Sequence, residues 1–245
     1  LLLRGHLSLD ELHAIHAGGQ PLVIDPQALP GIQASAAIVQ AAAAGDAPVY
    51  GVNTGFGKLA STRISAADLA TLQWNLIRSH SVGVGEPLAA PVVRLMLALK
   101  AASLARGHSG VRPEVIDTLV KVHNAGLVPC VPSQGSVGAS GDLAPLSHMT
   151  LALMGEGEFI VDGKRVPAIG PLVEHGIAPL RLQAKEGLAL INGTQTSTAL
   201  SLHALPSGDT RLLISSGIEP DRLAKLLTLG EATMQIWGGA ARARE

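Results

Sequence analysis

Apolar residues recur at helical spacing along most of the chain, and glycine or proline marks the ends of these segments. Residues 8–11 read Ser-Leu-Asp-Glu, which fits a helix-capping box, and apolar positions follow at helical spacing as far as Ile15. Gly18–Gly19 is expected to stop that helix. The alanine-rich residues 31–44 predict a second helix that ends at Gly45.

Further helices are predicted by the same combination of apolar repeats, capping residues and closing glycines. They begin at Ser65 or Asp68 and run toward His80, span residues 88–106, extend from Pro113 to Gly126, and cover residues 142–154. Short strands are expected at residues 22–24 and in a hairpin over residues 158–166, where Asp162–Gly163 forms a tight turn. The pattern predicts a mainly α fold with a small β-hairpin.

Composition narrows the kind of core that this fold can have. Of the 245 residues, 47% are hydrophobic but only 2% are aromatic, so alanine, leucine, valine and isoleucine must form the core. Close-packed helices suit these residues better than an all-β fold, which leans on aromatic and β-branched side chains. The length allows one large domain or two small ones.

Charge and cysteine content exclude several classes of partner. The formal net charge of −1 gives no electrostatic basis for binding nucleic acid or an anionic membrane. No apolar run reaches the ~18 residues of a membrane span. Arg4 follows the opening run of leucines instead of preceding it, so we expect no signal peptide. Cys130 is the single cysteine, which predicts a packed thiol, no internal disulfide and a cytoplasmic protein.

The histidines do not form a recognisable metal site. His13 and His16 are three residues apart on one predicted helix, but no third ligand is evident nearby, so we expect surface histidines and no bound metal. His80 falls near the end of its predicted helix, where a histidine usually caps the helix or faces solvent.

A stretch of small residues, 135–148, carries the most unusual chemistry. Gly141 has no Cβ, so its amide nitrogen could fold back onto the carbonyl of Ala139 and close a five-membered ring. Loss of water from that ring and from the Ser140 hydroxyl would leave an exocyclic methylene, which is a strong electrophile. Asp142 suits the start of the following helix. An ordinary flexible loop ahead of a helix is the alternative.

A second glycine-rich stretch, residues 50–58, superficially resembles a phosphate-binding loop. Its spacing is wrong, because five residues separate Gly51 from Gly57 and Leu59 stands where that loop needs serine or threonine. A glycine turn after a strand is the structural alternative, with Tyr50 as a packed aromatic.

Together, three stretches resemble the aromatic amino acid ammonia-lyase family, and within it most the members that act on histidine. They are residues 50–57, 135–148 and 185–195. The resemblance implies a methylidene-imidazolone group built autocatalytically from Ala139, Ser140 and Gly141, with Asp142 supporting its formation and no external cofactor. It therefore implies an enzyme of the carbon–nitrogen lyase class.

The resemblance also assigns roles to residues outside the electrophile. Tyr50, leading a glycine-rich lid, would remove the β-proton of the substrate, which requires nearby positive charge or helix N-termini because a phenol has a pKa near ~10. His80, following Ser79, would recognise an imidazole ring. Asn192 would contact the amino acid end of the substrate or the electrophile, and Gln195 would line the site.

The implied reaction is elimination of ammonia from L-histidine to give trans-urocanate, the first step of histidine degradation. Phenylalanine or tyrosine ammonia-lyases and aminomutases are the close alternative, favoured by a pocket in which His80 has no role. A non-catalytic truncated remnant is the alternative outside enzymes. The partners are then a small amino acid substrate and copies of the chain itself, since the family forms homotetramers whose active sites combine several subunits.

Beyond about Leu205 the resemblance fades. We expect residues 1–205 to form the active-site domain and residues 206–245 to be a divergent tail that begins with Pro206–Asp209. Family members are roughly twice as long, so the sequence predicts a truncated chain without the C-terminal helical half. Helices that lack their partners would expose apolar surface.

Overall fold

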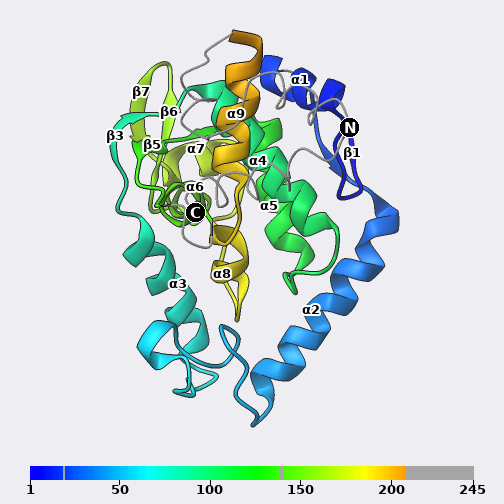
Figure 1. The fold of residues 1–245 in the computed structure, drawn as a ribbon, viewed down its shortest axis with the longest axis vertical. Helices are drawn as coiled ribbons and strands as arrows, with labels where there is room; N and C mark the ends of the chain where they lie inside the picture. Colours follow the sequence, from blue (N-terminus) through cyan, green and yellow to red (C-terminus); the bar gives the residue numbers. More distant parts are fainter. Residues whose placement is uncertain (19, 138–140, 208–245) are drawn as a thin grey trace, which may run out of the picture.

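Helices make up most of the fold, as the sequence predicts. The computed structural model describes residues 1–18, 20–137 and 141–207 (Figure 1). The helices are α1 (Leu9–Ala17), α2 (Leu29–Ala44), α3 (Leu69–His80), α4 (Ala90–Ala105), α5 (Pro113–Asn124), α6 (Leu143–Leu153), α7 (Ile169–Glu174), α8 (Glu186–Ile191) and α9 (Gln195–Ser207). Short 3-10 turns cover Pro26–Ala28 and Gly57–Leu59. The mainly α prediction is confirmed, and α9 continues through Pro206.

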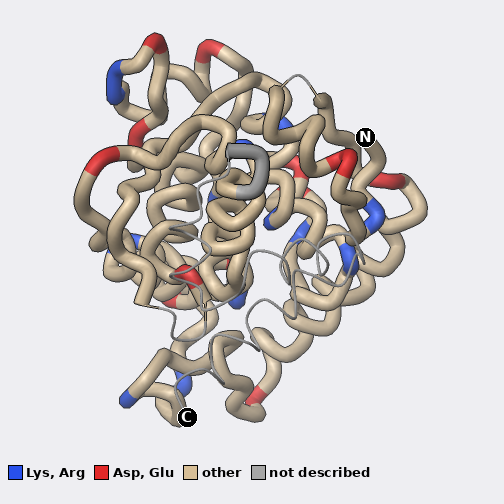
Figure 2. The backbone as a smooth tube through the Cα atoms, turned by 45° about the horizontal axis from the view of Figure 1, so that its top comes forward, with Lys and Arg blue, Asp and Glu red and all other residues tan. Residues whose placement is uncertain are grey.

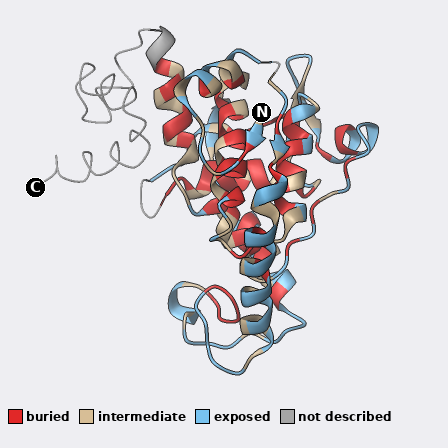
Figure 3. Cartoon of the chain, turned by 90° about the vertical axis from the view of Figure 1, so that its right-hand side faces the viewer, coloured by how far each residue is buried: buried red, intermediate tan, exposed pale blue. Residues whose placement is uncertain are grey.

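The core is built around α4, which is buried on almost every side. This helix packs against α1, α5 and α9, and its apolar side chains, among them Leu95, Met96 and Leu97, are fully enclosed. Each such side chain contributes about 1.5–3 kcal/mol on burial. Figure 3 shows the buried positions gathered in these central helices. Large apolar side chains also lie exposed outside the core, including Ile38 on α2 and Val137 in residues 135–142, here called the electrophile segment.

Local sequence signals set several helix ends. The Ser8 hydroxyl accepts a hydrogen bond from the amide of Glu11, and the Glu11 carboxylate accepts one from the Ser8 amide at 2.7 Å, so the predicted capping box is present. Gly18 ends α1 with φ of 90°. The predicted side-chain cap of α3 is wrong: Asp68 stands at the N-cap position, but its carboxylate accepts from the Ser65 hydroxyl instead of a helix amide.

The strands are short and form three small sheets. β1 (Leu2–Leu3) pairs in parallel with β2 (Val23–Ile24), and β3 (Val84–Pro87) pairs antiparallel with β5 (Pro132–Gln134). The predicted hairpin is confirmed as β6 (Glu158–Val161) and β7 (Lys164–Pro167), whose turn has positive φ at both central residues. β4 (Val128–Pro129) adds to β6 as a third strand, which the sequence pattern did not predict.

Charged residues are sparse and of mixed sign over the described part of the chain (Figure 2). His16 departs from the predicted surface position, because its Nε2 lies 2.7 Å from Nδ1 of His203 where α1 meets α9. Burial lowers the pKa of His16, and the neighbouring His203 lowers it further. Among the described residues there is no cluster of three or more metal-ligating side chains. None of the helices in this part of the chain is long and apolar enough to cross a membrane.

Candidate active site

Two of the motifs singled out in the sequence meet at Gly141 and Gly193. Gly141 has φ of 125°, and a Cβ placed on it would lie 2.5 Å from the Gly193 carbonyl oxygen and 2.7 Å from the Gly193 nitrogen. The Asp142 amide donates a 2.7 Å hydrogen bond to that same carbonyl. Only glycine permits this backbone-to-backbone approach. Ala139 and Ser140, the other two residues of the predicted electrophile, lie outside the described residues.

The Asp142 carboxylate joins the electrophile segment to α9. It is fully buried, and one of its oxygens accepts from the hydroxyls of Ser136, at 2.8 Å, and Ser197, at 2.7 Å. The other oxygen accepts from the Ser197 amide at 2.8 Å. Asp142 stands at the N-cap of α6, as predicted, but its side chain makes no capping hydrogen bond to that helix and instead caps the first turn of α9.

A lysine lies buried beside this junction. Lys100, on α4, is 1% exposed, and its Nζ donates to the carbonyls of Ala189 and Asn192 at 3.2 and 3.3 Å. Burial lowers the pKa of Lys100 to about 7, while the charge of Asp142 acts in the opposite direction. The sequence analysis missed this residue. Its signal is a single charge in the middle of a helical run, residues 95–105, in which Ser103 is the one other polar residue.

The short helix α8, which leads to Asn192, is anchored at its start by a buried ion pair. The Glu186 carboxylate accepts from Nε and Nη2 of Arg112 at 2.8 and 2.9 Å and from the Gln183 amide at 2.7 Å. The hydrogen bonds to Glu186 raise the pKa of Arg112. In the middle of α8, the side-chain oxygen of Gln73 accepts from the Leu188 amide. Sequence reasoning did not find these anchors either.

The Tyr50 loop rests on the same helix. Gly51 has φ of 69°, and a Cβ there would lie 2.6 Å from a methyl carbon of Leu188. Asn53 holds the loop from inside, because its buried amide donates to the carbonyls of Ala42 and Ala47. Tyr50 itself is 58% exposed and touches Phe56 edge-on. The loop follows α2 and not a strand, so that part of the structural alternative is wrong.

The two ring nitrogens of His80 differ in their contacts within the described residues: Nδ1 lies against groups of its own helix, and Nε2 has no hydrogen-bond partner there. Its Nδ1 lies 2.8 Å from the carbonyl oxygen of Leu76 and 3.1 Å from the hydroxyl oxygen of Ser79. Because a carbonyl can only accept, the contact with Leu76 favours the tautomer with the hydrogen on Nδ1. In that tautomer Nε2 is an acceptor. Beyond His80 the chain passes close to the entry of the electrophile segment, since a Cβ on Gly135 would lie 2.9 Å from the Gly83 Cα.

The structure brings four of the predicted site residues into one cluster: Gly141, Asp142, Asn192 and Gln195. The side-chain amide of Gln195 packs against Gly193, and its oxygen is buried without a described hydrogen-bond partner, while Asn192 is exposed. Among the described residues, no hydrogen bond joins Tyr50 or His80 to this cluster. These two lie on neighbouring segments that are themselves supported by α8 and by the β3–β5 pair.

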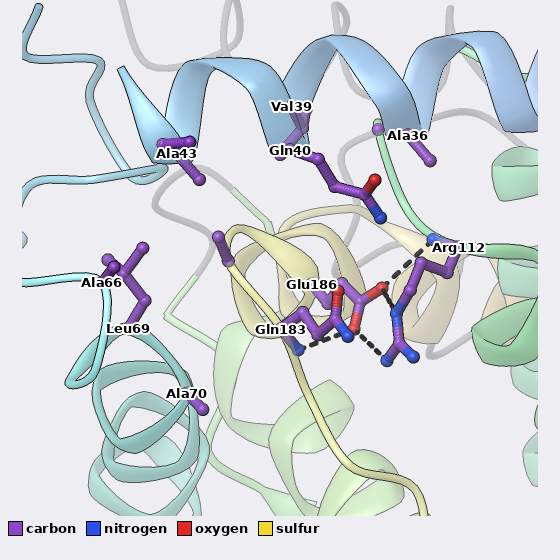
Figure 4. Close-up of a pocket in the computed structure, with 13 residues that line it drawn as sticks. Ala36, Val39, Gln40, Ala43, Ala66, Leu69, Ala70, Arg112, Gln183 and Glu186 are labelled. Carbon is purple, nitrogen blue, oxygen red and sulfur yellow. Dashed lines mark hydrogen bonds and ion pairs between the residues drawn. The ribbon is translucent and has the colours of Figure 1, made fainter. Parts of the chain in front are cut away.

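A groove elsewhere is a weaker candidate. It has a volume of about 290 Å³ and separates α2 from α3 and the start of α8 (Figure 4). Its walls are mostly small apolar side chains, and the charged Arg112 and Glu186 in it point at each other (Figure 4). None of the predicted site residues lines the groove. The cluster of Gly141, Asp142, Asn192 and Gln195 is therefore the better candidate for the active site.

Comparison with known proteins decides the family. The family pattern described as aromatic amino acid lyase matches residues 7–216. The chain belongs to the aromatic amino acid lyase family. Among curated lyases, it is 58% identical over 198 residues to a histidine ammonia-lyase of Aromatoleum aromaticum, covering 81% of this chain and 38% of that protein. The chain therefore spans well under half the length of that relative.

Solved structures of the family agree in fold. Histidine ammonia-lyase from Trypanosoma cruzi is 44% identical with a TM-score of 0.77, over 83% of this chain and 40% of that one. Tyrosine aminomutase from Streptomyces globisporus is 37% identical with a TM-score of 0.79, over 84% and 39%. The predicted resemblance to this lyase family, and to its histidine-specific members, is confirmed. The roles of individual site residues stay predictions.

Proposed function

We propose that this chain carries the part of an ammonia-lyase active site that forms the electrophile and eliminates ammonia from L-histidine, giving trans-urocanate. The contact of Gly141 with Gly193 carries this proposal. Ring closure needs the backbone on the C-terminal side of Ser140 held in an unusual, compact conformation. Gly141 has φ of 125°, which residues with a Cβ avoid, and Asp142 is bonded to Ser136 on one side and to α9 on the other; both observations support the proposal.

The residues present fit the methylidene-imidazolone group that the family implies. Gly141 lacks the Cβ that would obstruct ring closure, and the contact with Gly193 leaves no room for one. Ala139, Ser140 and Gly141 would form the group without an external cofactor. It would supply an electrophilic methylene next to the substrate.

The side chains of the chain itself then handle the substrate. Tyr50, on a loop braced by α8, takes the β-proton as the phenolate, a form that nearby positive charge or helix N-termini would favour once the phenol has lost its proton to solvent. Asn192 offers an exposed amide that can both donate to a carboxylate and accept from an amine. The amide of Gln195 lines the same cluster.

Two observations favour histidine as the substrate. The chain is 58% identical to a histidine ammonia-lyase, and Nε2 of His80 is left as an acceptor for the N–H of an imidazole ring. Phenylalanine or tyrosine lyase or aminomutase activity is the second candidate, because tyrosine aminomutase structures match the fold equally well. We further propose that residues 1–205 form the active-site domain, that 206–245 form a divergent tail, and that the active protein is a cytoplasmic homotetramer.

The first experiment is an intact-mass measurement on the purified chain beside Ser140→Ala. Ring formation removes two waters, about 36 Da, from the wild type and nothing from the control variant. Urocanate formation from histidine is then followed by absorbance, with phenylalanine and tyrosine as competing substrates. Tyr50→Phe should lower turnover at least about a hundredfold while keeping the mass deficit. An unmodified mass in the wild type would mean a non-catalytic remnant.

A further inference from the structure

Lys100 is a buried cationic side chain for which the proposed reaction has no use. It comes from the centre of α4, and both carbonyls that accept from its Nζ, those of Ala189 and Asn192, belong to the C-terminal end of α8. The last carbonyls of a helix lack partners within the helix and carry its negative dipole end. An amine or ammonium group at this place therefore caps α8.

The cap is one residue away from the glycine contact. The carbonyl of Asn192 accepts from Lys100, and the next carbonyl, that of Gly193, accepts from the Asp142 amide. Lys100 and Asp142 thus hold two successive carbonyl groups of the same turn. The charge of Asp142 also favours the protonated form of Lys100, which raises its pKa against the larger effect of burial.

We propose that Lys100 is a positioning residue that fixes the Asn192–Gly193 turn against the backbone of Gly141. It touches neither substrate nor electrophile and acts through the two carbonyls of α8. The proposal rests on the proposed function only in its consequence for catalysis. Its structural content, the support of this turn, stands by itself.

Hydrogen exchange tests the structural content directly. Lys100→Met keeps an unbranched apolar chain but removes every donor, so the amides of Asp142 and Asn192 should exchange about tenfold faster or more. The matched control is Met96→Ala, which opens a cavity in the same helix one turn earlier and leaves the donor of Lys100 in place. In Met96→Ala, hydrogen exchange at the amides of α4 and α5 should increase at least as much as exchange at the amides of Asp142 and Asn192.

The outcomes separate positioning from general stability. Faster exchange confined to the turn in Lys100→Met supports the proposal, and exchange that rises uniformly, or not at all at Asp142 and Asn192, overturns it. If Lys100→Met does not fold, the comparison is made with Lys100→Gln, which keeps an N–H donor of shorter reach. About threefold faster exchange at the same two amides is then expected, and unchanged exchange there overturns the proposal.

A second readout links the turn to chemistry. In Lys100→Met the fraction of chains showing the ring-formation mass deficit should fall. In Met96→Ala that fraction should stay at the wild-type value, even where the melting temperature of this variant equals that of Lys100→Met. If the wild type shows no deficit, the proposed function fails, but the exchange comparison still decides the role of Lys100. If the deficit persists in Lys100→Met while the turn loosens, the link to ring formation is wrong and the structural role remains.

Discussion

The amide nitrogen of Asp142 and the carbonyl oxygen of Gly193 lie 2.7 Å apart, which makes one hydrogen bond the direct join between two motifs distant in sequence. On one side of this bond is the C-terminal end of the predicted electrophile, and on the other is the turn that presents Asn192. Because Gly141 precedes the donor residue and the acceptor residue is itself a glycine, the two backbones approach without an intervening side chain.

Gly141→Ala should separate these backbones. The new Cβ would meet the Gly193 backbone at 2.5 Å in a conformation that L residues avoid. We expect a loss of at least about 2 kcal/mol in the free energy of unfolding, and no ring-formation mass deficit. Thermal unfolding and intact mass measure the two effects.

Gly163→Ala is the matched control for that change. Gly163 has positive φ, but no other atom lies within 4 Å of the position that a Cβ would take there, so this variant reports conformational strain alone, about 1 kcal/mol. Equal losses in the two variants would mean that the contact with Gly193 contributes nothing beyond strain.

Asp142→Asn should weaken the junction without changing its size. The carboxylate accepts from two hydroxyls and one amide, and a carboxamide has only one oxygen with which to do so. A buried donor left unpaired costs about 1–3 kcal/mol. We expect a lower melting temperature and incomplete ring formation by mass. Asp117→Asn on the exposed face of α5 should change neither, and a similar loss there would refute the argument.

Arg112→Met should destabilise the chain strongly, because Glu186 would remain buried without its partner. Breaking a buried pair in this way costs about 3–5 kcal/mol. The exposed pair of Lys121 and Asp117 is the control, and Lys121→Met should cost less than about 1 kcal/mol. Urea unfolding of both variants measures the difference. Comparable effects would show that the ion pair does not anchor α8.

Stability should depend on pH through Lys100. Its pKa falls from 10.5 to about 7 on burial, so below pH 7 both folded and unfolded chains hold the proton and the buried charge opposes folding in full. Between pH 7 and 10.5 only the unfolded chain holds it. The free energy of unfolding therefore rises with pH in this window, by up to about 1.4 kcal/mol per pH unit.

Unfolding of wild type and Lys100→Met from pH 6 to 10 isolates this contribution, because the other titrating groups are shared. The wild-type curve should climb above pH 7 relative to the variant curve. Parallel curves would show that Lys100 keeps an ordinary pKa in the folded chain.

The sequence predicts features that are decided within a few residues. The capping box at Ser8, the stop at Gly18 and the turn at Asp162–Gly163 are all present, because each depends on backbone angles and hydrogen bonds between near neighbours. The family resemblance likewise came from contiguous motifs and is confirmed.

Contacts between distant residues could not be predicted in the same way. Asp142 follows a glycine and precedes a helix, a context that favours capping that helix, yet Ser197 offers it both an amide and a hydroxyl. The partners of Lys100 could not be predicted from its apolar surroundings in the sequence, since a helical pattern does not reveal which helix end a buried amine will contact. Only the packing of α4, α8 and α9 decides these partners.

The bond between Asp142 and Gly193 also imposes an order in time on the synthesis of the protein. The triplet at 139–141 is translated well before Gly193 and Ser197, the residues that hold its C-terminal side. A nascent chain that has not yet extended past α8 lacks both partners. Any maturation that depends on this contact must therefore wait until Gly193 and Ser197 have been synthesised. In a chain whose synthesis stopped before Gly193, the triplet would stay unreacted.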